Sequence, residues 1–410
     1  MGAVSIFVAR QPIFDRANTV VGYELLYRRD ETRTSAEGTD ANTMSARVIS
    51  NAFLGVGISE LTGGAPGFVN FTRDQLLDGT YELFNPDEVV VELLETVHCD
   101  DETLRACEAM HALGYRFALD DFVYDASFDP LLALASIVKV DVLGREESDI
   151  HQLLSRIGAF KGRLLAERVE TEAVHRSCEA MGFQLFQGYF YARPETVAKE
   201  DLEAGQLTIL RLLTLLKDGE TSDAQIEIAL RADAGLCYKL LRMVNSAAIG
   251  GQAVESIKHA LRMVGRTALH RWLAIILAAS FASQGGTSKE LGLAALARAR
   301  LCEIIARRSS RRLAPDPLFM IGILSMMDAM MRVPMDRVLS LVEVSGEVYT
   351  ALSNRTGPLA NALLLVEAYD AGQWDVVKRL SLQVGVSAEA VPGFYFDALT
   401  WARTQLSLAS

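Results

Sequence analysis

The chain has 410 residues, half of them hydrophobic, which is enough for two or three domains with substantial cores. Its formal net charge of −12 argues against a general nucleic-acid binder or a binder of anionic membranes, because such partners attract basic surfaces. The N-terminus lacks the basic and apolar regions of a signal peptide, and no apolar run approaches the roughly 20 residues of a spanning helix. We therefore expect a cytoplasmic protein without membrane insertion.

The first half alternates short apolar runs with amphipathic stretches. The apolar runs cover residues 20–23, 67–69, 89–91, 116–119, 137–138, 163–166 and 183–186. Most are uninterrupted, as expected of strands that are buried on both faces of a parallel sheet. Helical patterns lie between them at residues 103–113, 150–160 and 173–181. Regular alternation of strand and helix predicts an α/β fold.

The second half shows only helical patterns. They cover residues 206–216, 223–230, 235–244, 254–264, 268–282, 290–307 and 359–369. Breaks are expected at residues 245–247 and 250–251. The polar stretch 193–203 is the best candidate for a junction. We therefore expect an α/β domain over residues 1–200 and an all-α domain over residues 201–410.

Polar residues end the apolar runs of the first half. They are Glu24, Asn70, Glu92, Asp120, Asp121, Lys139, Asp141, Glu167 and Gln187. In a (β/α) barrel the carboxyl ends of the strands converge on one face, so these groups would meet there. Carboxylates that repel one another are stabilised by cations, and oxygen ligands suit Mg²⁺ or Mn²⁺. Ordinary solvated strand ends are the alternative, and the residues alone leave both open.

The same residues lie in motifs that resemble those of EAL domains, the bacterial cyclic di-GMP phosphodiesterases. The resemblance spans roughly residues 9–194. Its motifs, in chain order, are Arg10-Gln11-Pro12-Ile13, Glu24-Leu25-Leu26-Tyr27-Arg28, Val69-Asn70-Phe71-Thr72, Val91-Glu92-Leu93-Leu94-Glu95, Asp120-Asp121-Phe122, Lys139-Val140-Asp141, Glu167-Arg168-Val169-Glu170-Thr171 and Gln187-Gly188-Tyr189. The combination in this order is specific, although each motif alone is weak.

The resemblance implies a TIM-like barrel and a role for each motif residue. Glu24, Asn70, Glu92 and Asp120 would hold one metal ion, and Asp121 would hold a second. Glu167 would bind metal or help to activate water, and Lys139 would position water or offset phosphate charge. Gln11, Arg28, Asp141 and Gln187 would contact the ligand, with Arg28 of the right type to grip phosphate. Two metal ions, Mg²⁺ or Mn²⁺, could neutralise the phosphodiester and generate the attacking water.

Two departures from the EAL pattern bear on activity. Residues 123–128 replace a glycine-rich stretch and contain no glycine, so this loop should have a different shape. Glu95, which supports that loop in the family, would lose its partner. Arg168 stands in place of a glycine beside Glu167 and could crowd the rim.

The second half resembles the HDOD domain, a non-catalytic relative of HD phosphohydrolases. The resemblance rests on residues 240–247, 257–265 and 319–328. Ser325-Met326 stands where an HD enzyme would have its His-Asp pair, and no histidine follows His270. Catalysis by a metal site of the HD type needs those imidazoles. This half is therefore expected to be non-catalytic. Its methionines at 320, 326, 327, 330 and 331 favour core packing over a partner surface.

Two functions remain open from the sequence. The chain is either a metal-dependent phosphodiesterase that converts cyclic di-GMP to linear pGpG, or a receptor that binds cyclic di-GMP with little or no turnover. The complete set of metal-ligand types favours the enzyme, and the altered loop favours the receptor. In both cases the HDOD half would regulate the barrel or act through an unidentified protein partner. A homodimer is open as an assembly, and no nucleic-acid partner is expected.

Overall fold

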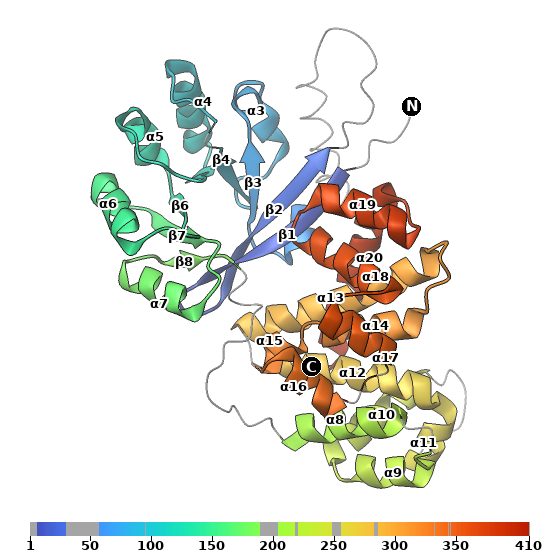
Figure 1. Cartoon of the computed structure of the whole chain (residues 1–410). Coiled ribbons are helices and arrows are strands. Elements are labelled where there is room, and N and C mark those ends of the chain that lie inside the picture. Colours follow the sequence, from blue (N-terminus) through green and yellow to red (C-terminus); the bar gives the residue numbers. More distant parts are fainter. Residues whose placement is uncertain are drawn as a thin grey trace. The chain divides into compact units, whose positions relative to one another are not determined.

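A computed structural model describes residues 6–29, 57–94, 96–188, 204–217, 220–247, 256–282, 286–331, 333–342, 344 and 346–409 (Figure 1). The chain forms two compact units. One consists of Met1–Arg193, Glu367–Leu382 and Ser387–Phe396, and the other of Pro194–Val366, Gln383–Val386 and Asp397–Ser410. The domain boundary predicted between residues 200 and 201 lies outside the described residues.

The first unit contains a closed barrel in which eight strands follow one another in chain order. They are β1 (Ile6–Asp15), β2 (Val20–Arg29), β3 (Gly67–Phe71), β4 (Val89–Leu93), β5 (Arg116–Leu119), β6 (Ile137–Asp141), β7 (Arg163–Glu167) and β8 (Leu185–Phe186). Strand β1 is antiparallel to both of its neighbours, β2 and β8, and the other neighbours are parallel. The TIM-like barrel predicted from the sequence is confirmed, with one reversed strand.

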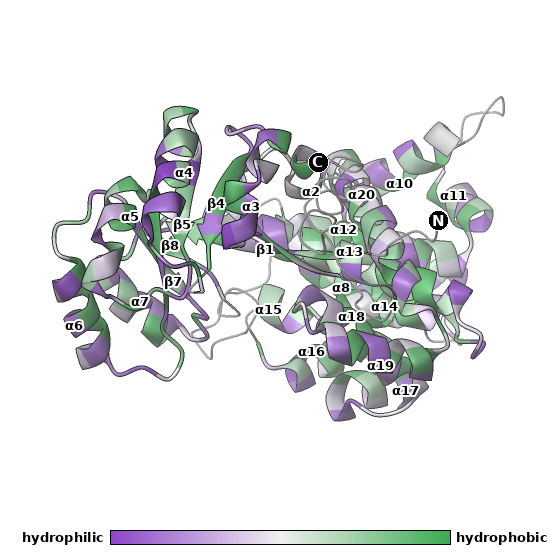
Figure 2. Ribbon diagram, turned by 90° about the horizontal axis from the view of Figure 1, so that it is seen from above, coloured by the Kyte–Doolittle hydropathy of each residue, from purple (hydrophilic) through white to green (hydrophobic). Residues whose placement is uncertain are grey.

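Helices follow most of the strands on the outside of the barrel. They are α2 (Ile58–Thr62), α3 (Arg73–Leu77), α4 (Asp101–Ala112), α5 (Asp129–Leu134), α6 (Glu147–Ile157) and α7 (Glu172–Ala180). Helix α6 buries Ile150, Leu153 and Ile157, which lie on one face at helical spacing. Figure 2 accordingly shows hydrophilic and hydrophobic stretches side by side on α4, α6 and α7.

Side-chain caps fix where these helices begin. The Asp100 carboxylate accepts hydrogen bonds from the backbone N–H groups of Glu102 and Thr103 at the start of α4. Thr171 accepts one from Val174 at the start of α7. Each cap satisfies backbone donors that a helix leaves open and so sets the length of the preceding loop. The loop between Glu167 and α7 is consequently only a few residues long.

The second unit is helical throughout its described residues. Its elements are α8 (Ala204–Lys217), α9 (Asp223–Arg231), α10 (Ala234–Ala247), α11 (Ile257–Val264), α12 (Arg266–Ala282), α13 (Gly286–Arg308), α14 (Pro315–Leu324), α15 (Met327–Met331), α16 (Met335–Val342), α17 (Gly346–Tyr349) and most of α18 (Pro358–Asp370). The all-α prediction is confirmed. Met320, Met326, Met327, Met330 and Met331 are buried, in agreement with core packing.

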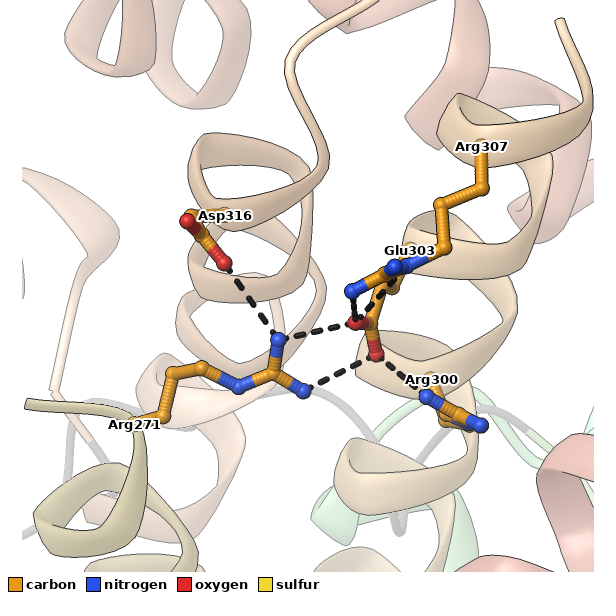
Figure 3. Close-up of polar contacts among 5 residues, drawn as sticks. All are labelled: Arg271, Arg300, Glu303, Arg307 and Asp316. Carbon is orange, nitrogen blue, oxygen red and sulfur yellow. Dashed lines mark hydrogen bonds and ion pairs between the residues drawn. The ribbon is translucent and has the colours of Figure 1, made fainter. Parts of the chain in front are cut away.

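A buried carboxylate ties together three helices of this unit (Figure 3). Glu303 of α13 is 1% exposed and accepts hydrogen bonds from Arg271 of α12 and from Arg300 and Arg307 of its own helix. Arg271 also lies 3.3 Å from Asp316 of α14. Burial alone would raise the pKa of the Glu303 carboxyl, but the hydrogen bonds from the three arginines lower it to about 2.

The C-terminal helices α19 (Trp374–Val384) and α20 (Val391–Ala409) contribute to both units. Within the barrel unit, the buried Tyr369 hydroxyl donates a hydrogen bond of 2.9 Å to the Val8 carbonyl of β1. Phe396 packs against the main core of the barrel. The barrel unit is therefore completed by residues that lie more than 180 positions after its last strand in the sequence. Within the described residues, none of the helices has the length and apolar character needed to cross a membrane.

Candidate active site

A ring of polar residues lies directly above a ring of apolar ones inside the barrel. Seven strands each contribute one residue to a buried apolar cluster: Ile13, Phe68, Val90, Ala118, Ile137, Leu165 and Leu185. On β2 the matching position is Gly22, where a Cβ would lie 2.6 Å from Cε2 of the Phe68 ring. Side chains alternate between the two faces of a strand, so the residue two places nearer the carboxyl end of the parallel strands faces the same interior.

Those eight residues form what we call the polar ring. They are Gln11, Glu24, Asn70, Glu92, Asp120, Lys139, Glu167 and Gln187. Two of them lie just beyond a strand, but the ladder continues through them, since the Asp120 N–H donates to Leu93 and the Gln187 N–H to Ala166. Strand β1 runs in the opposite direction, and its pairing with β2 brings Gln11 level with Glu24. The sequence singled out all eight, and the barrel register brings them to one level.

Lys139 lies at the centre of the carboxylates of this ring. Its Nζ is 2.7 Å from Oε1 of Glu92, 2.7 Å from Oδ1 of Asp120, 2.9 Å from Oε1 of Glu167 and 3.6 Å from Oε2 of Glu24. The four carboxylates come from four strands or strand ends. One ammonium group therefore offsets part of a charge that would otherwise be strongly repulsive.

The enclosure of this cluster changes its acid–base behaviour. Burial raises the pKa of the Glu92 carboxyl well above its usual value, although Lys139 opposes the shift. Burial alone would lower the pKa of the Lys139 ammonium, but the surrounding carboxylates raise it well above its usual value. Burial likewise raises the pKa of Glu167, to about 7. Lys139 therefore stays charged, and Glu167 can exchange a proton near neutral pH.

Two glutamines close the ring where the first and last strands meet. The Gln187 side-chain amide donates to Oε2 of Glu24 at 2.6 Å and to Oε1 of Gln11 at 3.1 Å. Gln187 Oε1 is buried without a hydrogen-bond partner. Such an atom is costly unless a bound molecule or water satisfies it.

One further carboxylate lies nearer the mouth of the barrel. Asp141 is two residues beyond Lys139 on β6 and pairs in register with Glu167. It forms an ion pair with Arg168, a pairing that the sequence analysis missed because it treated Arg168 as an obstacle. Asp121, the candidate for a second metal, is exposed and has a φ of 43°. The Arg28 side chain and Glu95 lie outside the described residues.

The donor set of the ring suits a hard divalent cation, since it consists of carboxylate and amide oxygens. Glu92 Oε2 is fully buried without a hydrogen-bond partner, as expected of an atom reserved for another ligand. In the part of the chain that the structure describes, no three acidic, histidine or cysteine side chains are arranged to hold a metal ion as they stand. The Lys139 ammonium occupies the centre of the carboxylates. The oxygen ligands therefore fit a cation chemically once that ammonium moves away from them.

Comparison with known proteins finds two family models and relatives that match nearly the whole chain. The EAL domain family model matches residues 39–194, and the HDOD domain family model matches residues 206–343. The uncharacterized protein YuxH of Bacillus subtilis is 31% identical over 403 residues, covering 97% of this chain and 98% of its own. The cyclic di-GMP phosphodiesterase CdgJ of Vibrio cholerae is 29% identical over 400 residues, covering 97% and 92%. The solved structure of Klebsiella pneumoniae BlrP1 with calcium and cyclic di-GMP is 23% identical, with a TM-score of 0.38, over 46% of this chain and 55% of that one.

Proposed function

We propose a function for this chain, which belongs to the family of proteins that join an EAL domain to an HDOD domain. It is a metal-dependent phosphodiesterase that opens cyclic di-GMP to linear pGpG. The observation that carries the proposal is the polar ring. It brings four carboxylates, one ammonium group and two glutamine side chains together at the same height inside the barrel. The name of CdgJ supplies the substrate.

Glu24, Asn70, Glu92 and Asp120 would hold a divalent cation, Mg²⁺ or Mn²⁺, and Asp121 would hold a second. When bound, the cation neutralises charge on the phosphodiester and acidifies water. Glu167 accepts the proton of the attacking water, for which a pKa of about 7 is well matched. Lys139 keeps its positive charge throughout and offsets the charge of the ring or of the phosphate. Gln11 and Gln187 orient the dinucleotide, and Arg28 grips its phosphate.

Incubation of the full chain with cyclic di-GMP and Mg²⁺ or Mn²⁺, with chromatography of the product, tests the proposal. We expect pGpG from the wild type and none from Glu24→Ala, which lacks a metal ligand, or from Glu167→Gln, which lacks the base. Glu108→Gln, on the exposed side of α4, is the matched control and should keep activity. Folded wild-type protein that makes no pGpG with either metal would remove the enzymatic proposal.

One observation favours a receptor as the second candidate. After Phe122 the chain forms a short 3-10 helix, Ala126–Phe128, in which Asp125 accepts hydrogen bonds from the Ser127 N–H and hydroxyl. This compact loop contains no glycine and stands, a few residues after Asp121, where the family has a glycine-rich stretch. Calorimetry with Ca²⁺ measures binding and the product assay with Mg²⁺ or Mn²⁺ measures turnover, and the two together separate the candidates. A receptor binds cyclic di-GMP without making pGpG, whereas the enzyme does both.

The HDOD half acts as a regulatory or partner-binding module in this proposal. It lacks the His-Asp pair that an HD enzyme needs, because Ser325 and Met326 stand in its place. Hydrogen exchange of the full chain with and without cyclic di-GMP tests coupling. Protection changes in α8 and α14 on ligand addition support it, and changes confined to the polar ring oppose it.

A further inference from the structure

Position 168 requires a backbone conformation that arginine adopts only at a cost. Arg168 has a φ of 54°, in the left-handed region that glycine occupies freely. Its neighbours impose this conformation. Glu167 belongs to the polar ring, and the next residue, Val169, is fully buried and donates its N–H to the Gln187 carbonyl at 3.0 Å.

The opposite side of this turn is equally constrained. Gly188 packs so tightly on it that a Cβ there would lie 2.4 Å from both the N and the O of Val169. The chain cannot relax the turn without moving Val169 or residues 187–188. An arginine that keeps a strained conformation at the edge of a candidate active site indicates a use for its side chain.

The side chain of Arg168 lies at the mouth of the barrel. It forms an ion pair with Oδ2 of Asp141, whose Oδ1 accepts a hydrogen bond from the Leu143 N–H. The Asp141 side chain is 12% exposed, whereas that of Arg168 is 60% exposed. Asp141 therefore anchors the guanidinium group, while more than half of the Arg168 side chain stays exposed and can contact a ligand.

The charge of the site explains what such a group can bind. Among the described side chains of the site, Glu24, Glu92, Asp120, Asp121, Asp141 and Glu167 carry six negative charges when ionised, while Lys139 and Arg168 carry two positive charges. A cyclic dinucleotide brings two more negative charges, one on each phosphodiester. In the proposed function the polar ring would hold the phosphodiester that is cleaved, and a cation nearer the mouth would offset the charge of the second one.

We infer that Arg168, anchored by Asp141, binds the second, uncleaved phosphodiester of a cyclic dinucleotide. The inference rests on the proposed function and deepens it, because it makes the site selective for ligands with two phosphodiesters. A role limited to neutralising Asp141 would leave ligand affinity unchanged when Arg168 is removed. A role in reading guanine would affect ligands with one and two phosphodiesters alike.

Calorimetry of the full chain in Ca²⁺ tests the inference with two probes. Cyclic di-GMP has two phosphodiesters, and the linear dinucleotide GpG has one. We expect Arg168→Gly and Arg168→Ala to weaken binding of cyclic di-GMP by about tenfold or more, the loss of one charge-assisted contact, and to leave the Kd for GpG within about twofold. Arg168→Lys should recover part of the loss. Arg176→Ala, which removes an exposed arginine paired with Glu172 on α7, is the matched control and should bind like wild type.

The Gly and Ala variants also separate the side chain from the backbone. Both lack the guanidinium, but only glycine relieves the left-handed conformation. The Tm of Arg168→Gly should therefore exceed that of Arg168→Ala by about 2–4 °C, although the two bind equally weakly. Unchanged cyclic di-GMP affinity in Arg168→Gly, or an equal loss for GpG, overturns the inference while leaving the proposed function intact. Wild-type protein that binds no cyclic di-GMP removes both.

Discussion

The Lys139 ammonium nitrogen lies 2.7 Å from Oε1 of Glu92, and both side chains are completely excluded from solvent. A buried pair of this kind balances a large desolvation cost against a large Coulomb gain, and the balance fails when one partner is removed. Lys139 is the positive partner of four carboxylates at once. The metal-free site therefore depends on a single side chain.

Replacing Lys139 by Met should destabilise the folded chain by about 3–5 kcal/mol, because the carboxylates lose their buried counter-charge. Mg²⁺ or Mn²⁺ should restore more of the Tm in this variant than it adds to wild type, since a divalent cation can take the central place. Thermal unfolding with chelator and with metal measures both effects. Lys161→Met, at an exposed position, is the control. A Lys139→Met chain with wild-type Tm and no extra response to metal would contradict this account.

Glu167 should make stability depend on pH near neutrality. Burial raises the pKa of its carboxyl from 4.5 to about 7, so the folded chain binds this proton more tightly than the unfolded chain. The group therefore destabilises the fold progressively as the pH rises through that range. Glu167→Gln removes the titration, so its unfolding free energy should rise relative to wild type between about pH 5 and pH 8, by up to roughly 3 kcal/mol. Denaturant titrations with chelator measure the difference. A difference that is constant with pH would show that Glu167 does not titrate there.

Glu303 should behave in the opposite sense. The pKa of its carboxyl is lowered to about 2, so it stabilises the fold above the usual carboxyl range and loses that contribution as the pH falls toward 2. Glu303→Gln should cost about 2–3 kcal/mol at neutral pH and progressively less below about pH 4. Glu227→Gln, which breaks a pair with Arg231 on the surface of one helix, should cost less than about 0.5 kcal/mol. Equal costs for the two variants would argue against a special role for the Glu303 network.

Tyr369→Phe tests the attachment of the C-terminal segment to the barrel. The change leaves the ring in place but removes the hydrogen bond to Val8, which should cost about 1–2 kcal/mol and increase hydrogen exchange along β1. Tyr238→Phe, at a position 65% exposed, should have no measurable effect on unfolding. Hydrogen exchange in β1 that stays at the wild-type rate would show that this contact does not support the barrel.

The sequence predicted seven residues of the polar ring because each follows an apolar run, whereas Gln11, which lies within the reversed strand β1, was named only through the resemblance to EAL domains. Periodicity assigns a face but not a distance, so it could not place Lys139 at the centre of four carboxylates. The left-handed turn at Arg168 accompanies the close packing of Val169 on Gly188, and the glycine that EAL domains have at this position was its one signal in the sequence. The helix predicted at residues 235–244 continues to Ala247, since Asn and Ser weaken a helix too little to break it there. The helical pattern at residues 359–369 predicted α18 without indicating which surface it covers, and α19 and α20 were not predicted.

The C-terminal segment has a consequence for how the chain is made. A ribosome that has finished β8 still has to synthesise the whole helical unit before Tyr369 and Phe396 reach the barrel. Until then the outer surface of β1 lacks its final cover, and the nascent chain presents apolar surface that chaperones recognise. A premature stop codon between the end of β8 and residue 367 would release eight strands without the segment that completes their packing. Loss of the second half should therefore lower the cellular amount of the barrel, and not only its regulation.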